Sequence, residues 1–340
     1  MKKIFLLFIL FIASFNIDAQ QAPIMVCNAL GTTCTPYYNL DTAIVYASSG
    51  NYIYIPGGIF PININIKKEL HIIGAGHYPD STNVTGMSQI ANNIVFDTNS
   101  SNSSLEGLYT STIISTDVSY TTSNIQIIRC NMDGITFANE YYGMANNYFY
   151  CNNCLIKDCI SRSDITVPMT NGAISNCILG SIKILNTSTV NNCVFFGAIS
   201  PNCYGCVTNS TFKNNIFDSS AQSSLTCPGC VLKNNLTVYS ALGILSAALE
   251  VGTITNVPLS NLFVNATTAG FDYTKNFHLL SSSPGHNAGD DGTDVGIYGS
   301  STPYNDGAVP SNPHVMFKSI GGSTDASGNL PVQIKVRVGN

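Results

Sequence analysis

The sequence predicts an all-β protein built as a solenoid of short stacked strands, a right-handed parallel β-helix. Three observations support this prediction: a six-copy repeat, a low charge with many Asn residues, and alternating strands near the N-terminus. Repetition at a period near 20 residues is typical of one supersecondary unit stacked on the next. Right-handedness is expected from the strong bias of parallel crossover connections.

The repeat has the pattern apolar, any residue, polar, Cys or Asn, apolar. By subtraction of positions, its copies begin 28, 18, 16, 22 and 20 residues apart. Short apolar pairs alternating with Asn and Gly favour strands and turns over a helical stripe. We expect the first residues of the copies to point inward and to stack in one column: Ile128, Ile156, Ile174, Val190, Phe212 and Leu232.

The composition supports the same fold and excludes some functions. Charged residues make up 10% of the chain, against about 25% in typical soluble domains, while 44% of the residues are hydrophobic and 38 are Asn. Asn tolerates the left-handed turns that each coil needs. The net charge is −5, and the chain has no basic stripe of the kind that nucleic-acid binding requires. Nothing in the sequence indicates binding to a membrane surface.

Residues 1–19 resemble a secretory signal peptide. Lys2 and Lys3 precede an unbroken apolar run from Ile4 to Ala13, and Ala19 offers a small residue for cleavage. The run is too short to span a bilayer, and no later stretch reaches that length. We therefore expect an exported protein, periplasmic, cell-surface or extracellular, whose residues 20–38 form an N-terminal segment.

The next residues predict a short helix followed by strands. An N-cap candidate precedes a helix over Asp41–Ala47. Residues 52–60 then read as an alternating strand closed by a Pro-Gly turn, and strict alternation continues at Ile62, Ile64 and Ile66. The segment 70–76 adds one more strand. This order resembles the opening of the pectate-lyase-like superfamily of right-handed parallel β-helices, in which the helix would cap the open end of the solenoid.

The resemblance extends to the C-terminal part of the chain. Residues 283–290 and 294–298 look like the closing segment of many secreted bacterial β-helix proteins, so we expect the β-helix to cover residues 39–302. Pro303, Gly307 and Pro310 indicate a linker. Two strand-like runs, 315–320 and 330–338, predict a terminal β-hairpin within residues 303–340.

The cysteines predict structural roles. Cys27 and Cys34 are expected to form a disulfide in an oxidising compartment. The Cys-x-x-Cys pairs (Cys151/Cys154, Cys203/Cys206 and Cys227/Cys230) are open to disulfides or stacking, to buried thiols, or to a metal. A stacked ladder at the turn of each repeat is predicted without a metal site, because a buried Cys behaves as a small apolar residue: Asn131, Cys159, Cys177, Cys193, Asn215 and Asn235.

Two classes of function are compatible with this sequence. The first is a non-catalytic protein, either a carbohydrate-binding module or a structural or adhesive rod. The second is a polysaccharide lyase or glycoside hydrolase, as the resemblance implies. A lyase would use an Arg or Lys base with carboxylates that bind calcium to a uronate, and a hydrolase would use paired carboxylates. No cofactor is otherwise expected. The sequence leaves both the enzymatic activity and the oligomeric state open.

Residues 129–164 are the predicted working surface, because seven charged residues fall in this stretch. Its longest repeat interval predicts a loop rich in aromatic residues such as Phe137, of the kind that stack on sugar rings. The alternative is that the loop only shields the coil. The catalytic candidates are Arg129, Asp133, Asp158, Arg162 and Asp164, and the ligand-binding candidates are Tyr141, Tyr142, Tyr148 and Tyr150.

Overall fold

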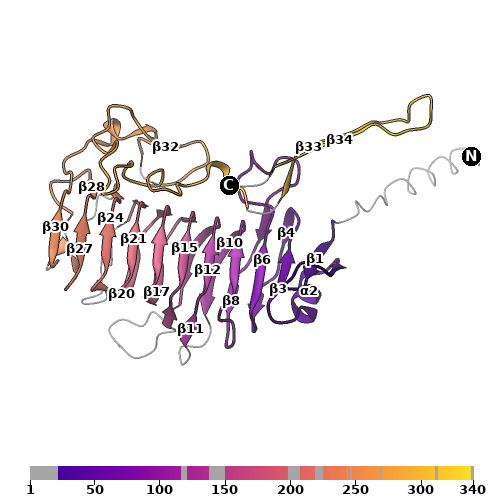
Figure 1. The fold of residues 1–340 in the computed structure, drawn as a ribbon, viewed down its shortest axis with the longest axis horizontal. Helices are drawn as coiled ribbons and strands as arrows, with labels where there is room; N and C mark the ends of the chain where they lie inside the picture. Colours follow the sequence, from indigo (N-terminus) through magenta and orange to yellow (C-terminus); the bar gives the residue numbers. More distant parts are fainter. Residues whose placement is uncertain are drawn as a thin grey trace, which may run out of the picture.

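The protein is a long stack of short strands, most of which pair with the preceding and the following coil (Figure 1). The structure is a computed structural model. Two large and mostly parallel sheets run along the stack, which is consistent with the predicted solenoid. The described residues are 22–115, 121–137, 150–197, 207–218, 225–242, 244–245, 247–268, 270–310 and 313–337.

The first sheet has twelve strands and is parallel except around β1, which pairs antiparallel with both of its neighbours. In spatial order its strands are β2 (Cys34–Tyr37), β1 (Ile24–Cys27), β3 (Asn51–Tyr54), β6 (Leu70–Ile73), β9 (Ser104–Glu106), β12 (Gln126–Ile128), β15 (Leu155–Lys157), β18 (Ala173–Ser175), β21 (Thr189–Asn191), β24 (Thr211–Lys213), β27 (Val231–Lys233) and β30 (Leu249–Val251).

The second sheet has sixteen strands. They are β4 (Gly58–Phe60), β5 (Ile64–Ile66), β7 (Ser88–Ile90), β8 (Ile94–Phe96), β10 (Tyr109–Ser115), β11 (Thr121–Ser123), β13 (Asn131–Thr136), β14 (Tyr150–Asn152), β16 (Ile160–Ser161), β17 (Ile165–Thr170), β19 (Ile178–Leu179), β20 (Ile182–Asn186), β22 (Val194–Phe195), β23 (Val207–Thr208), β25 (Ile216–Phe217) and β28 (Leu236–Thr237). Small two-stranded sheets are formed by β26 (Leu225–Thr226) with β29 (Ile244–Leu245), and by β31 (Phe263–Asn265) with β32 (Asn276–Leu279).

The helix predicted near the N-terminus is α2 (Leu40–Tyr46), which lies within one residue of the expected bounds. Asn39 is its N-cap, and the Asn39 side-chain oxygen accepts a hydrogen bond of 2.9 Å from the backbone N–H of Thr42. This bond satisfies one of the donors that the first helical turn leaves free. The apolar side of the helix joins the same core as Ile53 of the first coil. Two short 3₁₀ helices, Leu259–Asn261 and Asp306–Ala308, lie near the other end of the chain.

The inward column of the first sheet confirms the repeat but corrects its register by one residue. Ile127, not Ile128, pairs with Ile156 and is buried, whereas Ile128 is half-buried beside Lys157. The first copy of the repeat therefore begins at Ile127. From there the paired and buried residues continue coil by coil through Ile156, Ile174, Val190, Phe212 and Leu232.

A turn with left-handed backbone follows each of these strands and explains the abundance of Asn. The residue two positions after the inward residue has a positive φ, such as 53° at Asn176 and 56° at Asn214. Asn and Asp adopt this conformation more readily than other non-glycine residues. A second set of left-handed residues, including Asn153 and Asn171, lies before the same strands. The Asn content thus reflects two turns per coil.

A ladder of Cys and Asn side chains follows the left-handed residue. The register correction puts Cys130 in the ladder in place of Asn131, which pairs with Ile160 in β16. From Cys159 onward, each ladder side chain donates to the carbonyl of the inward residue one coil back, as Cys159 Sγ does to Ile127 at 3.3 Å and Asn215 Nδ2 does to Val190 at 2.9 Å. The ladder consists of Cys130, Cys159, Cys177, Cys193, Asn215 and Asn235.

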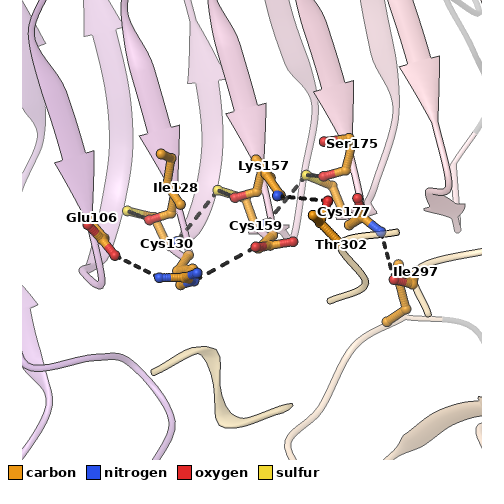
Figure 2. Close-up of polar contacts among 12 residues, drawn as sticks. Glu106, Ile128, Cys130, Lys157, Cys159, Ser175, Cys177, Ile297 and Thr302 are labelled. Carbon is orange, nitrogen blue, oxygen red and sulfur yellow. Dashed lines mark hydrogen bonds and ion pairs between the residues drawn. The ribbon is translucent and has the colours of Figure 1, made fainter. Parts of the chain in front are cut away.

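Ladder side chains also accept a backbone N–H from the preceding coil. Cys159 Sγ accepts from Cys130 N at 3.5 Å, and Asn215 Oδ1 accepts from Cys193 N at 2.9 Å. Figure 2 shows Cys130, Cys159 and Cys177 on successive coils. Burial raises the pKa of the Cys159 and Cys177 thiols, so they stay protonated and can donate. A thiol and an amide therefore satisfy the same pair of backbone groups.

The other cysteines of the described part of the chain form disulfides. Cys27 is bonded to Cys34, Cys151 to Cys154, and Cys227 to Cys230. Cys203 and Cys206 lie outside the described residues. Both described Cys-x-x-Cys pairs thus take the disulfide alternative, while the free thiols are the buried ladder cysteines.

Residues 255–310, which we call the return segment, run back along the side of the stack instead of adding coils up to residue 302. They cover an outward apolar row on the second sheet that includes Ile178, Val194 and Ile216. Side chains of the left-handed Asn residues bind this segment, as Asn234 Nδ2 does to Ala288 O and Asn176 Nδ2 does to Ile297 O, both at 2.9 Å. Residues 304 and 308–309, expected in a linker, are buried.

The predicted terminal hairpin is present as β33 (His314–Ile320) and β34 (Val332–Arg337). It projects from the stack on the side of β4, far from β30 (Figure 1). At the other end of the stack, Glu250 of β30 pairs with Leu232 and so occupies the inward column of the last coil. An inward charge at an edge strand discourages the addition of any strand that places an apolar residue opposite it.

Candidate ligand-binding site

The structure places the catalytic candidates in two different locations. Some lie at the turns that follow β12 and β15, and the others lie on the outer face of the second sheet. Arg129 and Asp158 are the left-handed turn residues of successive coils, with φ of 51° and 54°. Asp133 and Arg162 lie on neighbouring strands of the second sheet or beside them. Sequence distance alone does not distinguish the two locations.

Arg129 and Asp158 form a largely buried cluster with Glu106. Arg129 Nη1 lies 2.9 Å from Glu106 Oε1, and Arg129 Nε lies 3.8 Å from Asp158 Oδ2. The Asp158 side chain is only 3% exposed. Figure 2 shows Glu106 at this turn, beside the ladder cysteines. These groups lie at the turns after β12 and β15 and are largely closed to solvent.

Burial raises the pKa of Asp158 to about 6, although the positive charges of Lys157 and Arg129 oppose the shift. Asp158 Oδ1 has no hydrogen-bond partner within the part of the chain that is described. The equivalent position in four later coils is Asn, which carries no charge and suits the left-handed turn: Asn176, Asn192, Asn214 and Asn234.

Asp158→Asn is therefore expected to stabilise the fold at neutral pH by about 1 kcal/mol. A carboxyl whose pKa is raised on folding lowers the unfolding free energy when it is ionised. This loss is absent below about pH 4, grows up to about pH 6 and is constant above that pH. The shift from 3.8 to about 6 corresponds to a penalty of about 3 kcal/mol, in which the attraction to Arg129 is already included, and we expect about a third of it to be recovered. Urea unfolding at pH 7.5 and pH 4.5 measures the difference.

The stabilisation by Asp158→Asn should be larger at pH 7.5 than at pH 4.5. Asp80→Asn, at an exposed carboxyl, is the matched control and should change the unfolding free energy by less than about 0.5 kcal/mol at either pH. An equal effect of Asp158→Asn at both pH values would contradict a buried charge as its cause.

The second group forms an accessible site on the outer face of the second sheet. Arg162 Nη2 lies 2.9 Å from Asp133 Oδ1, and the guanidinium carbon lies 4.6 Å from the centroid of the Tyr109 ring. Arg162 also donates to the Tyr109 hydroxyl. The Arg162 and Asp133 side chains are 32% and 56% exposed. We call Tyr109, Asp133 and Arg162 the Arg162 surface.

Asp164 lies near this surface but has partners of its own. Lys183 Nζ is 2.7 Å from Asp164 Oδ2, and the Ser181 hydroxyl donates to Asp164 Oδ1. Partial burial would raise the pKa of Asp164, but the hydrogen bonds from Lys183 and Ser181 outweigh it and lower the pKa. A carboxyl held in its ionised form is a poor general acid at neutral pH.

Tyr273 of the return segment links the Arg162 surface to a neighbouring cleft. Its hydroxyl accepts from Asn131 Nδ2 at 2.9 Å and donates to the His77 carbonyl at 2.8 Å. Asn131, expected in the ladder, thus anchors the return segment next to Tyr109, its partner in the sheet. Tyr109 and Tyr273 carry no signal in the sequence, because neither falls within the repeat.

The cleft has a volume of about 530 Å³ and is lined by residues that are far apart in the sequence, among them Tyr78, Tyr273 and Tyr298. The His278 ring stacks on Tyr298 with centroids 3.6 Å apart. Asp306 accepts a hydrogen bond of 2.6 Å from the Tyr298 hydroxyl and lies 3.3 Å from His278 Nε2. Only the path of the return segment brings these groups together.

The predicted aromatic loop falls mostly on residues 138–149, which lie outside the described part of the chain, so Tyr141, Tyr142 and Tyr148 stay predictions. Tyr150 begins β14 and is exposed. Phe137, expected on the loop, is instead buried in the core, where its ring packs edge-on against Phe96 at 5.8 Å.

A scan against models of protein families finds no match for this chain, and a search of curated proteins finds no relative. Within the described ranges, no three His, Cys, Asp or Glu side chains lie close enough together to bind a metal ion. None of the described helices has the length and apolar character needed to cross a bilayer.

Proposed function

We propose that this chain is an exported right-handed β-helix of the pectate-lyase-like type that binds an extracellular polysaccharide without cleaving it. The binding site is the Arg162 surface, extended by the cleft beyond Tyr273. The N-terminal helix caps the first coil of the stack. The disulfides of the described residues support an oxidising location.

The observation that carries the proposal is the Arg162–Tyr109–Asp133 arrangement on the outer face of a rigid sheet. The flat guanidinium of Arg162, held over the Tyr109 ring, offers a stacking surface to a sugar ring, and its fork matches the geometry of a uronate carboxylate. Asp133 fixes the guanidinium in place and offers an acceptor for sugar hydroxyls. Residues on a sheet are held more rigidly than residues on a loop, which reduces the entropy lost on binding.

Binding is favoured over cleavage because the candidate carboxylates are engaged elsewhere. Asp133 pairs with Arg162, Asp164 pairs with Lys183, and Asp158 is buried beneath the return segment. Paired-carboxylate hydrolysis needs one accessible carboxyl with a raised pKa. Asp158 has the raised pKa but lacks the access, while Asp164 is accessible with a lowered pKa.

Arg162→Ala is expected to weaken binding to acidic glycans by about tenfold or more, because a charge-assisted bidentate contact is lost. The mature chain is first applied to a glycan array, and affinity for any hit is then measured by calorimetry. Lys67→Ala removes one positive charge at an exposed site and should leave the affinity within about twofold. Unchanged affinity in Arg162→Ala, with the fold intact, would remove this surface from consideration.

The same glycan hit distinguishes binding from catalysis. Incubation with the mature chain should give no ultraviolet absorbance of unsaturated uronate and no new reducing ends. Either product would overturn the non-catalytic proposal: the absorbance together with new reducing ends would indicate a lyase, and new reducing ends without the absorbance would indicate a hydrolase. Addition of calcium to the incubation covers the lyase case.

A further inference from the structure

The last coil of the stack ends in a strand with an open edge. β30 is the final strand of the twelve-stranded sheet, and no described strand pairs with its outer side. Its apolar residues Leu249 and Val251 are 51% and 46% exposed. An exposed edge of this kind presents backbone N–H and C=O groups that can pair with another strand. Glu250 is the only charge on β30.

The terminal hairpin also has an exposed apolar strand, β34, with a free edge. Ile334 and Val336 of β34 are 54% and 58% exposed, and within the described residues β34 pairs with β33 alone. An isolated two-stranded hairpin is at best marginally stable in water. A third strand on the free edge of β34 would satisfy its backbone groups and place apolar neighbours beside Ile334 and Val336 on the same face.

The two strands match in sequence and in charge. β30 reads Leu249-Glu250-Val251, and the centre of β34 reads Ile334-Lys335-Val336. If the two strands pair with their central residues opposite each other, Lys335 lies opposite Glu250 in both the parallel and the antiparallel arrangement. The four apolar residues then lie on the other face. Opposite charges directly across a strand pair are favourable, and like charges are unfavourable.

The two strands lie at opposite ends of the molecule. The hairpin projects beside β4, while β30 is the strand furthest from it along the stack (Figure 1). We propose that the hairpin of one copy of this chain adds to β30 of a second copy, with Lys335 paired to Glu250. Because the contact joins two different surfaces, it is heterologous, and repetition gives linear head-to-tail assemblies instead of a closed dimer.

Sedimentation velocity of the mature chain over a range of concentrations tests this assembly. The wild type should show a series of species that grows with concentration. Glu250→Lys and Lys335→Glu should each weaken association by about tenfold or more, because each places like charges opposite one another. The double variant restores the opposite charges in exchanged positions and should recover most of the association.

Lys318→Glu is the matched control. It makes the same change of charge in the same hairpin, but Lys318 pairs with Ile334 and not with the strand centre. Its association should stay within about twofold of the wild type. A monomer at all concentrations, a series that stops at a dimer, or a double variant as weak as the single ones would each overturn the proposal.

Discussion

Ile174→Asp is expected to lower the free energy of unfolding by at least about 4 kcal/mol. Ile174 is fully buried in the inward column, between Ile156 and Val190 of the adjacent coils. The substitution removes apolar packing and places a carboxylate where no described cation faces it. Urea unfolding followed by circular dichroism measures the loss.

Ser175→Asp is the matched control for this variant, since it places the same side chain one residue further along the same strand. Ser175 faces outward, and its neighbour in β15 is Lys157. We expect a change of less than about 1 kcal/mol. If the two variants lost similar stability, the inward column would not be the core of the stack.

Asn215→Ala should cost about 3 kcal/mol of stability, the second largest effect we expect. The Asn215 side chain accepts from Cys193 N and donates to both Val190 O and Asn235 Oδ1. Truncation leaves a buried N–H and a buried C=O without partners, and such groups cost more than the mean hydrogen bond contributes. The measurement is again denaturant unfolding.

Two further variants separate the ladder from a general effect of losing Asn. Asn65→Ala changes an exposed residue of β5 and should cost less than about 0.5 kcal/mol. Asn215→Cys introduces the residue that holds the equivalent position one coil earlier and should retain a part of the stability. A loss in Asn215→Ala no greater than that in Asn65→Ala would show that the ladder bonds do not stabilise the fold.

The sequence was sufficient to predict the stacked strands, because inward apolar residues and left-handed turns recur in all six copies of the repeat. The register of the first copy was ambiguous, since Ile127 and Ile128 are both apolar, and Cys130 and Asn131 both suit a ladder. Strand pairing resolves it, as Ile127 joins the column of Leu105 and Ile156. The first copy was aligned one residue too late because Arg129 occupies its left-handed position. This position favours Asn, so Arg129 did not indicate a turn.

The candidate site was predictable only in part. Charge density pointed to residues 129–164, and within this stretch Asp133 and Arg162 do come together. Tyr109 and Tyr273 reach the same place through the sheet register and the return segment, neither of which has a periodic signal in the sequence. The cleft joins residues from Tyr78 to Asp306, so its existence depends on a long-range path that local patterns cannot encode.

The return segment also changes how the molecule can come apart. A simple solenoid has contacts only between neighbouring coils, so it can fray from either end one coil at a time. Here a single stretch of chain is bonded to Asn234 near one end and, through Gly307, to Ser81 near the other. Opening an end coil must also release this stretch, which couples distant coils into one cooperative unit. Because its contacts span more than 200 residues in sequence, the return segment is expected to dock late in folding.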